Sequence, residues 1–250
     1  MKNVLFLSRT IPTIEPWDHI LTEIDASIRV LPYSEDLDFE SIDTVLAWNP
    51  PEGIFPKLPN LKLIQSLGMG VDHLFKTKDR PPTMPIARII DADMANQMSE
   101  YSLYGALTAF RNFHHYRAAK ARAEWAPEPR NFHDEFAIGI LGYGELGRTT
   151  ATRLRQNGFP NIRLWSRTPK VIPSLKCYAG KEELLDFAKN LDLLICLLPL
   201  TAETESILNS RLFDQLNPNA YLINAARGEH LNHADLIDAI ESKQISGALL

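Results

Sequence analysis

Short apolar runs rich in β-branched residues alternate with helical stretches along the whole chain. Alternation of this kind is typical of α/β domains with mostly parallel sheets. It predicts strands at residues 4–7, 28–31, 44–47, 63–66 and 86–90 in the first half, and at 137–141, 162–165, 193–198 and 220–224 in the second. The last residues, "SGALL", begin a further strand.

One long helix is predicted between the two sets of strands, over residues 94–123, because this stretch has no proline and one glycine. Its aromatic residues recur at helical spacing, which favours a packed helix face, and part of that face is a candidate subunit interface. We place a domain boundary near the start of the helix, which gives domains at residues 1–98 and 99–250.

Composition narrows the class of protein. The 250 residues are 45% apolar and 23% charged, as in an ordinary globular protein, and the formal net charge of −5 argues against nucleic acid or an anionic membrane as a partner. No apolar run has the length of a membrane span or of a signal-peptide core. Two cysteines make no disulfide framework, and no metal site is predicted. We therefore expect a cytoplasmic protein.

The stretch "FAIGILGYGELGRTTATRL" has the order strand, glycine-rich turn, helix, with a G-x-G-x-x-G pattern. In such a turn Gly142 permits the tight bend, Gly144 lets the backbone approach a pyrophosphate, and Gly147 lets helix and strand pack closely. The amides of Glu145 and Leu146, at the helix N-terminus, would then face the phosphates. The pattern alone is weak evidence, but its place between a strand and a helix predicts a dinucleotide site.

The end of the next strand indicates which dinucleotide. An NAD site usually has a carboxylate there for the ribose 2′-hydroxyl, whereas this chain has Ser166, Arg167 and Thr168. A guanidinium and two hydroxyls suit a 2′-phosphate, so we predict NADP(H) as cofactor, with NAD(H) as the less favoured alternative. The alternative for Arg167 is a solvated loop side chain.

Two more loops are expected at the carboxyl edge of the same sheet. The apolar strand that ends in Leu198 and Pro199 leads to Thr204, in a loop that either faces the cofactor or only stops the strand and caps a helix. The following strand leads through Ala225 to Arg227. A charge there is costly unless it is paired, and a substrate carboxylate would pair with it through two parallel hydrogen bonds.

Four segments together resemble the D-isomer-specific 2-hydroxyacid dehydrogenases: "INAARGEHLNHADLIDAIESKQISGALL", "IGILGYGELGR", "LLPLTAET" and "SLGMGVDHL". "RIIDADMANQMSEYSLYGAL" and "LWSRTPK" resemble the NADPH-dependent glyoxylate/hydroxypyruvate reductase A branch. The resemblance implies two doubly wound domains, a flavodoxin-like substrate domain and a Rossmann dinucleotide-binding domain, with the active site in the interdomain cleft. It also implies a homodimer formed through the long helix and the loop after it.

Residue roles follow from the same resemblance. Arg227 matches the arginine that holds the substrate carboxylate and polarises its carbonyl. The amides around Met69 and Gly70 match the loop that binds the carboxylate, and the glycine-rich sequence there can present amides to an anion. Trp48 matches a residue near the substrate, although a core tryptophan is about as compatible with its sequence context. Arg88 is implied to lie near the same site.

The implied reaction is hydride transfer to the C2 carbonyl of a small 2-oxo acid, glyoxylate or hydroxypyruvate. Arginine can stabilise the developing alkoxide but cannot donate a proton at neutral pH, whereas a histidine oriented by a carboxylate can. The family's glutamate and histidine would lie beyond Leu250, so we expect the sequence to be the N-terminal portion of a longer enzyme. Five of the seven histidines are considered for this role and none matches it; they are His73, His114, His115, His230 and His233.

Two alternatives to this function stay open at the level of sequence. One is a catalytically silent dinucleotide-binding protein with a regulatory role, because a fold alone does not establish an activity. The other is a dehydrogenase for a larger 2-hydroxy acid.

Overall fold

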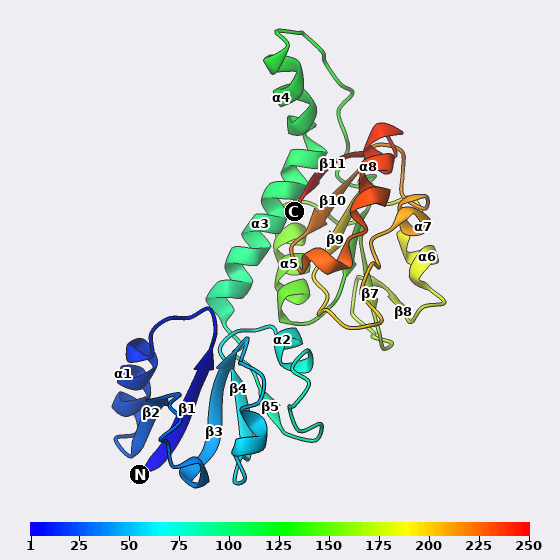
Figure 1. Cartoon of the computed structure of the whole chain (residues 1–250). Coiled ribbons are helices and arrows are strands. Elements are labelled where there is room, and N and C mark those ends of the chain that lie inside the picture. Colours follow the sequence, from blue (N-terminus) through cyan, green and yellow to red (C-terminus); the bar gives the residue numbers. More distant parts are fainter. The chain divides into compact units, whose positions relative to one another are not determined.

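The computed structural model describes residues 1–250 and consists of two compact units, Met1–Asp91 and Ala92–Leu250. Each unit is an α/β domain built on a single parallel sheet, which confirms the predicted fold class (Figure 1). The boundary expected between residues 98 and 99 falls inside helix α3 (Ala92–Phe110). None of the helices combines the length and the apolar character that a membrane span requires.

Unit 1 has the strand order β2-β1-β3-β4-β5, the flavodoxin-like order, with every neighbouring pair parallel. The central strands carry the buried residues, since the two faces of the sheet pack into separate apolar clusters. Its strands and α-helices are β1 (Lys2–Ser8), α1 (Glu15–Ile24), β2 (Ile28–Pro32), β3 (Ile42–Trp48), β4 (Leu63–Ser66), α2 (Asp72–Phe75) and β5 (Ile86–Ala87).

Unit 2 has a six-stranded sheet of order β11-β10-β9-β6-β7-β8, again all parallel. Strands β6, β9 and β10 are buried at every position, which explains their continuous apolar sequences. After α3, its elements are α4 (Phe113–Ala121), β6 (Ile138–Leu141), α5 (Glu145–Gln156), β7 (Ile162–Ser166), β8 (Lys176–Ala179), α6 (Leu184–Ala188), β9 (Leu193–Cys196), α7 (Ser210–Phe213), β10 (Ala220–Asn224), α8 (His233–Glu241) and β11 (Ile245–Leu249).

The order of strands in unit 2 reverses between β6 and β9. The chain builds outward from β6 through β7 and β8, and then returns to the other side of β6 for β9, β10 and β11. Loops that leave the carboxyl ends of β6 and β9 therefore run in opposite directions and leave room for a ligand at this switch point. The glycine-rich turn follows β6, and the loop of Pro199 and Thr204 follows β9.

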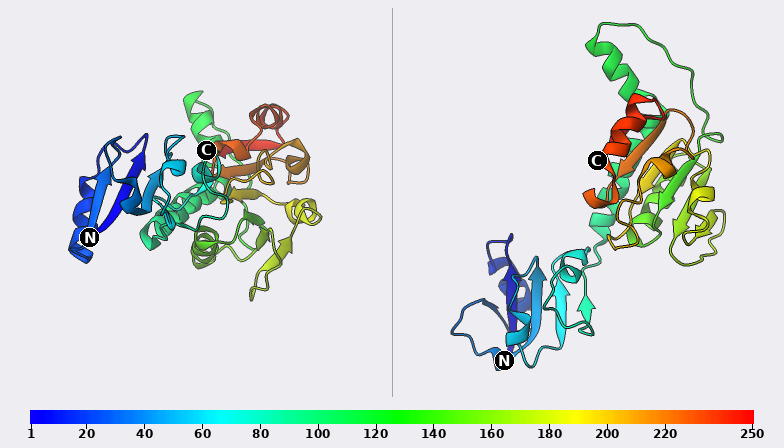
Figure 2. Two further views of the ribbon diagram at one scale, coloured as in Figure 1. Left: turned by 60° about the horizontal axis from the view of Figure 1, so that its bottom comes forward. Right: turned by 45° about the vertical axis from the view of Figure 1, so that its right-hand side comes forward.

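The helix predicted as one element over residues 94–123 is two. Helix α3 ends at Phe110, and α4 begins at Phe113 after Asn112, which has a left-handed backbone with φ of 53°. Asparagine adopts this conformation more readily than most residues, so the break needed no glycine or proline. Helix α4 projects beyond the sheet of unit 2, and residues 122–137 return from its end to β6 (Figures 1 and 2).

Candidate functional site

The glycine-rich turn after β6 is shaped by two of its glycines. Gly142 has φ of +100°, a conformation that side-chain-bearing residues rarely adopt. A Cβ atom at Gly147 would collide with the carbonyl oxygen of Gly142, so only glycine lets the first turn of α5 approach the strand end this closely. These two positions bend the chain sharply from the sheet into the helix.

The third glycine leaves open space where the helix begins. A Cβ atom on Gly144 would meet no atom within 4 Å, although the residue is the N-cap of α5. The first hydrogen bond of the helix is donated by the amide of Arg148 to the Gly144 carbonyl, at 3.0 Å. The amides of Glu145, Leu146 and Gly147 precede it and need an acceptor from elsewhere. An open approach with several free amides fits a dinucleotide pyrophosphate.

The polar residues after β7 form a short turn at the same edge of the sheet. Ser166 is buried, and its hydroxyl donates to the carbonyl of Thr168 at 2.8 Å. Arg167 and Thr168 are exposed. Strand β7 lies next to β6, so this turn lies beside the glycine-rich turn, where the adenosine ribose of a dinucleotide would lie. No carboxylate is present at residues 166–168.

The loop after β9 lies against the glycine-rich turn. Leu198 is buried, and its Cδ2 lies 3.3 Å from the position that a Cβ of Gly142 would take. The Thr204 hydroxyl donates to the carbonyl of Pro199 at 2.8 Å and accepts from the amide of Thr201 at 2.9 Å. Thr204 therefore holds this loop in a closed turn, so its hydroxyl is committed to the loop's own backbone.

Arg227 follows β10 and is half-buried, with its backbone held from both sides by buried side chains. The Asn224 amide donates to the Arg227 carbonyl at 2.9 Å, and the Asn224 oxygen accepts from the amide of Ala226 at 3.3 Å. The Nδ1 atom of His230 lies 3.1 Å from the amide nitrogen of Arg227. Ala225 donates its amide to the carbonyl of Cys196 at 3.2 Å, which continues the pairing of β10 with β9 to the start of the loop.

In unit 1, the loop after β4 is organised by Ser66, which is fully buried. The Ser66 hydroxyl accepts from the amide of Gly68 at 3.3 Å and donates to the carbonyl of Gly70 at 2.9 Å. None of these bonds uses the amide of Met69 or Gly70, so both can bind an anion. Arg88 donates to the carbonyl of Met69 at 3.3 Å and holds the outer side of the loop.

Trp48, at the end of β3, supports the same loop. A Cβ atom on Gly68 would lie 2.6 Å from the Trp48 indole, so the loop rests directly on the ring. The indole also packs against the imidazole of His73, at a centroid distance of 4.3 Å. Trp48 is only partly buried, so it is neither a fully enclosed core residue nor a free surface side chain.

The predicted residues thus form two groups. The glycine-rich turn, Ser166–Thr168, the loop of Pro199 and Thr204, and Arg227 all lie at one edge of the sheet of unit 2, and Trp48, Met69 and Gly70 lie together in unit 1. Sequence reasoning missed the roles of Ser66 and Asn224 and favoured a solvated or capping role for His230, which is fully buried. A polar residue at the end of a buried strand was a readable signal for Asn224 and for Ser66. For His230 the sequence offered no such signal.

None of the histidines of unit 2 is positioned to donate a proton to a substrate at the carboxyl edge of its sheet. His230 is fully buried, and both of its ring nitrogens lie within hydrogen-bonding distance of backbone atoms. His233 is exposed on the first turn of α8, and His114 and His115 belong to α4. His133 precedes β6, and its ring packs on Phe110 and Phe159. No group of three or more His, Cys, Asp or Glu residues is arranged to hold a metal ion.

Comparison with known sequences matches the chain to a family of dehydrogenases and to reductases of that family. The family model described as "D-isomer specific 2-hydroxyacid dehydrogenase, NAD binding domain" matches residues 103–250. A glyoxylate/hydroxypyruvate reductase A from Serratia proteamaculans is 42% identical over 218 residues, which cover 85% of this chain and 69% of that protein.

Solved structures of similar fold were found as well. A D-isomer-specific 2-hydroxyacid dehydrogenase from Xanthobacter autotrophicus Py2, in complex with NADPH and MES, has a TM-score of 0.90 at 32% identity and covers 99% of this chain and 79% of its own. An NADPH-dependent glyoxylate/hydroxypyruvate reductase from Sinorhizobium meliloti, in complex with NADP and sulfate, has a TM-score of 0.86 at 29% identity and covers 100% and 80%.

Proposed function

The chain belongs to the D-isomer-specific 2-hydroxyacid dehydrogenase family, and from this premise we propose that it reduces glyoxylate or hydroxypyruvate with NADPH. One observation supports this most directly. An open glycine-rich turn with three unpaired amides and an arginine with a fixed backbone lie at the same edge of one parallel sheet. The first suits a dinucleotide and the second suits a carboxylate. The similar proteins with reductase names support the same reaction.

The residues of the chain divide the work in this proposal. Arg227 binds the substrate carboxylate and stabilises the negative charge that develops on the C2 oxygen. In unit 1 the amides of Met69 and Gly70 are assigned to binding an anion, and the Trp48 indole, on which their loop rests, to limiting the size of the bound group. The cofactor supplies the hydride when it is bound. The alkoxide takes its proton from a group other than Arg227, because a guanidinium does not act as a proton donor in catalysis at neutral pH.

NADPH rather than NADH is proposed because of the turn after β7. A 2′-phosphate carries negative charge, which the exposed guanidinium of Arg167 can bind and which a carboxylate would repel. The exposed hydroxyl of Thr168 can donate a hydrogen bond to the phosphate as well. The relatives from Xanthobacter and Sinorhizobium hold NADPH and NADP in their structures.

The test is a steady-state assay of NADPH oxidation by the protein expressed from its complete reading frame. Glyoxylate, hydroxypyruvate and pyruvate are compared, each with NADPH and with NADH. We expect turnover with the first two acids and preference for NADPH. Binding of NADPH without turnover of any acid would favour a silent dinucleotide-binding protein, and a preference for pyruvate over both other acids would contradict the proposed substrates.

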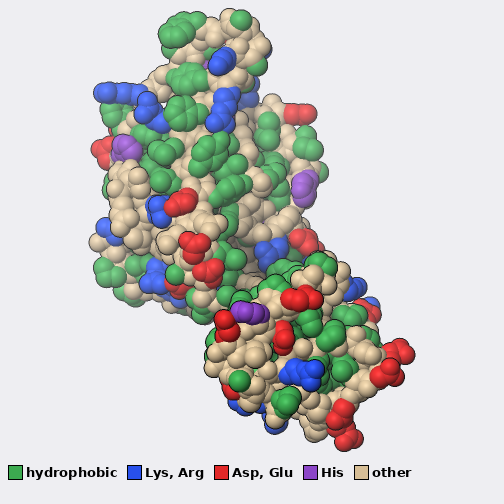
Figure 3. All heavy atoms as spheres, turned by 90° about the vertical axis from the view of Figure 1, so that its left-hand side faces the viewer, with side chains coloured by type: hydrophobic (Ala, Val, Ile, Leu, Met, Phe, Trp, Pro, Cys, Tyr) green, Lys and Arg blue, Asp and Glu red, His purple; other side chains and the backbone are tan.

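We further propose that the protein is a homodimer that pairs through α3, α4 and the loop after α4. Hydrophobic side chains gather over α3 and α4 on the face of unit 2 shown in Figure 3. Exposed large side chains in this region include Tyr104, Leu107, Phe113 and Tyr116, and Trp125 in the loop is 94% exposed. Isolated exposed apolar residues are common, but a set on adjacent elements is typical of a protein interface.

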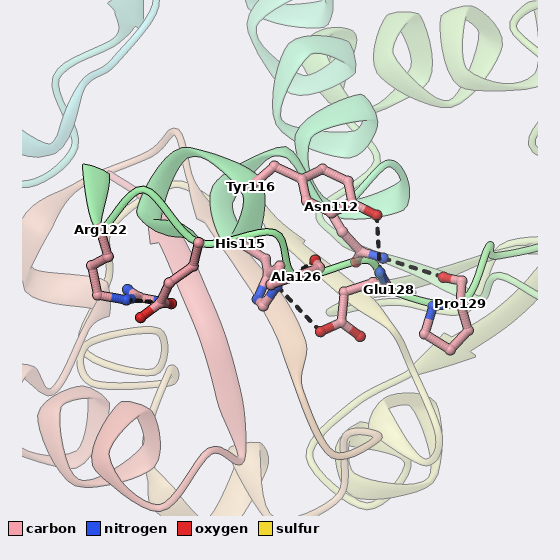
Figure 4. Close-up of polar contacts among 8 residues, drawn as sticks. Asn112, His115, Tyr116, Arg122, Ala126, Glu128 and Pro129 are labelled. Atoms are coloured by element: carbon pink, nitrogen blue, oxygen red, sulfur yellow. Dashed lines mark hydrogen bonds and ion pairs between the residues drawn. The ribbon is translucent and has the colours of Figure 1, made fainter. Parts of the chain in front are cut away.

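The loop that carries Trp125 is fastened to α4, as an interface element should be. His115 lies 3.2 Å from the carbonyl of Ala126 and 3.3 Å from the Glu128 carboxylate, and the Tyr116 hydroxyl accepts from the amide of Glu128 at 3.2 Å (Figure 4). These contacts hold the loop against the helix, so the exposure of Trp125 is a property of an ordered segment.

A cytoplasmic location is also part of the proposal. Cys177 and Cys196 form no disulfide. Free thiols are typical of proteins from a reducing compartment. Burial raises the pKa of the Cys196 thiol to about 12, so this cysteine is a core residue and unreactive.

A further inference from the structure

His230 occupies an unusual place for a histidine in this fold. It is the last residue of the short 3₁₀-helix η3 (Gly228–His230), directly after Arg227, and none of its surface is exposed. Its Nδ1 atom lies 3.1 Å from the amide nitrogen of Arg227, and its Nε2 atom lies 3.3 Å from the carbonyl oxygen of Pro199. The ring therefore joins the loop after β10 to the loop after β9.

The chemistry of its neighbours assigns the protons of the imidazole. The carbonyl of Pro199 can only accept, so Nε2 carries hydrogen and donates to it. In a neutral ring Nδ1 is then an acceptor, and the amide of Arg227 donates to it. Nδ1 lies equally near the Arg227 carbonyl, at 3.1 Å, but the Arg227 amide can only donate, so Nδ1 is its acceptor and carries no hydrogen.

The two buried side chains therefore share the backbone of Arg227 between them. Asn224 holds its carbonyl and His230 holds its amide, and the residue is extended, with φ of −130° and ψ of 149°. These bonds determine the direction in which the Arg227 side chain leaves the main chain. Two parallel hydrogen bonds to a carboxylate require a guanidinium placed to within roughly 0.5 Å. A small change at the backbone would misplace it.

We propose that His230 is a positioning residue that, as the neutral Nε2–H tautomer, sets Arg227 for binding the substrate carboxylate and couples the loop of Arg227 to the loop of Pro199. This inference rests on the proposed function, because it takes Arg227 as the residue that binds the acid. His230 itself neither donates the proton of the reaction nor contacts the substrate.

The test compares two substitutions of His230. In His230→Asn the side-chain oxygen stands near the former Nδ1 and accepts from the Arg227 amide, whereas His230→Leu fills a similar volume with no acceptor. Loss of one hydrogen bond to this amide is expected to lower kcat/KM for the 2-oxo acid by about tenfold in H230L. H230N should recover most of that loss. The Kd for NADPH should change less than kcat/KM in both variants, because the Pro199 loop is also held by two hydrogen bonds of Thr204.

His233→Leu is the matched control, since His233 is an exposed histidine three residues further along the chain. H233L should leave kcat/KM unchanged. A second readout needs no turnover: the ¹⁵N chemical shifts of the His230 ring in the wild-type protein should be those of a neutral Nε2–H tautomer. This measurement tests the assignment even where H230L does not fold.

Several results would overturn the inference. They are a wild-type kcat/KM in H230L, a loss in H230N as large as in H230L, or an Nδ1–H tautomer in the wild-type spectrum. Failure of the proposed function would look different. The wild-type protein would then reduce no 2-oxo acid, or Arg227→Ala would retain full activity instead of losing the 10²-fold or more expected for a group that stabilises the developing charge.

Discussion

Four buried polar side chains hold the loops at the carboxyl edge of unit 2: Ser166, Thr204, Asn224 and His230. Each of them binds main-chain atoms, so each satisfies its own polar atoms and fixes a loop conformation at the same time. A loop held in this way keeps its shape before any ligand arrives. Of the two arginines assigned to ligands, Arg227 is half-buried and Arg167 is exposed.

At the residue scale, replacing Gly147 and replacing Gly144 in the glycine-rich turn should have different effects. Gly147→Ala forces a Cβ into the Gly142 carbonyl, and overpacking of this kind costs about 1–3 kcal/mol, which lowers Tm by roughly 2–10 °C. Gly144→Ala meets no protein atom, so it should fold with a smaller change of Tm but weaken NADPH binding by about tenfold or more, because the methyl group fills the phosphate approach.

Calorimetry and fluorescence titration with NADPH separate the two effects. If Gly144→Ala binds NADPH as tightly as wild type, the proposal that the pyrophosphate binds at this turn is wrong. An unchanged Tm in Gly147→Ala would show that the turn relaxes without cost.

The preference for NADPH should depend on one exposed side chain. Arg167→Ala removes the charge expected to pair with the 2′-phosphate, and the KM for NADPH should rise by about tenfold while that for NADH stays the same. Arg211→Ala, at an exposed arginine of α7, is the control. If R167A raises the KM for NADPH and the KM for NADH equally, Arg167 does not bind the 2′-phosphate.

At the scale of elements, the break between α3 and α4 has the largest consequence. Helix α3 packs along the sheet and α5, and Gly105 is so close to Ile223 and Leu249 that a Cβ there would collide with the Ile223 side chain. Helix α4 leaves this packing after Asn112 and carries the loop of Trp125. Helix α4 contacts the sheet of unit 2 through His114, whose ring packs on Tyr221 of β10 at a centroid distance of 5.2 Å.

The stability of this attachment should depend on pH. Burial lowers the pKa of His114 below its ordinary value of 6.5, with a smaller opposing effect from the Thr108 carbonyl. The unfolded chain therefore binds this proton at a higher pH than the folded one. The stabilisation is complete above pH 6.5 and is lost as the pH falls from 6.5 through the lowered pKa.

His114→Gln tests this origin, because glutamine does not titrate. Between pH 7.5 and pH 5.5 the wild-type Tm should fall by more than the Tm of H114Q, since all other groups contribute equally to both proteins. Parallel Tm curves for the two proteins would assign the pH dependence to other residues.

At the scale of the whole molecule, the two units share one architecture and differ in what their sheet edges present. Unit 1 presents a loop with two free amides on a tryptophan, and unit 2 presents a glycine-rich turn and an arginine. Both sets lie at the carboxyl ends of parallel strands, where ligands of such sheets bind. Two parallel-sheet units with different strand orders thus present two kinds of candidate anion site.

The proposed homodimer is tested through Trp125. Trp125→Ser removes a large side chain that is 94% exposed, and burial of an indole at an interface is worth several kcal/mol, so the mass measured by light scattering should shift towards the monomer at micromolar concentration. Val171→Ser is the control, because Val171 is 99% exposed but lies outside α3, α4 and their loop. A W125S protein that remains dimeric, or a monomeric wild type, would contradict this interface.

Much of the fold was predictable, for a physical reason. Strands at 63–66 and 220–224 occur at the predicted residues, and the strand at 220–224 is buried at every position, which requires an almost continuous apolar sequence. Strand β8 was missed, since it is an edge strand with no fully buried residue and therefore no such pattern. The break at Asn112 was missed because a left-handed asparagine leaves no signature in an otherwise helical sequence.

By itself, the sequence determined the two parallel α/β units, the glycine-rich turn and the position of Arg227 at a strand end, because periodicity and motif spacing are local properties of a chain. Only the tertiary structure decided what holds these parts in place. Ser66, Asn224 and His230 act through hydrogen bonds to main-chain atoms, and Pro199 lies 31 residues before the ring that it binds. Such contacts depend on how strands are ordered in a sheet, and this order cannot be predicted from any single segment of the sequence.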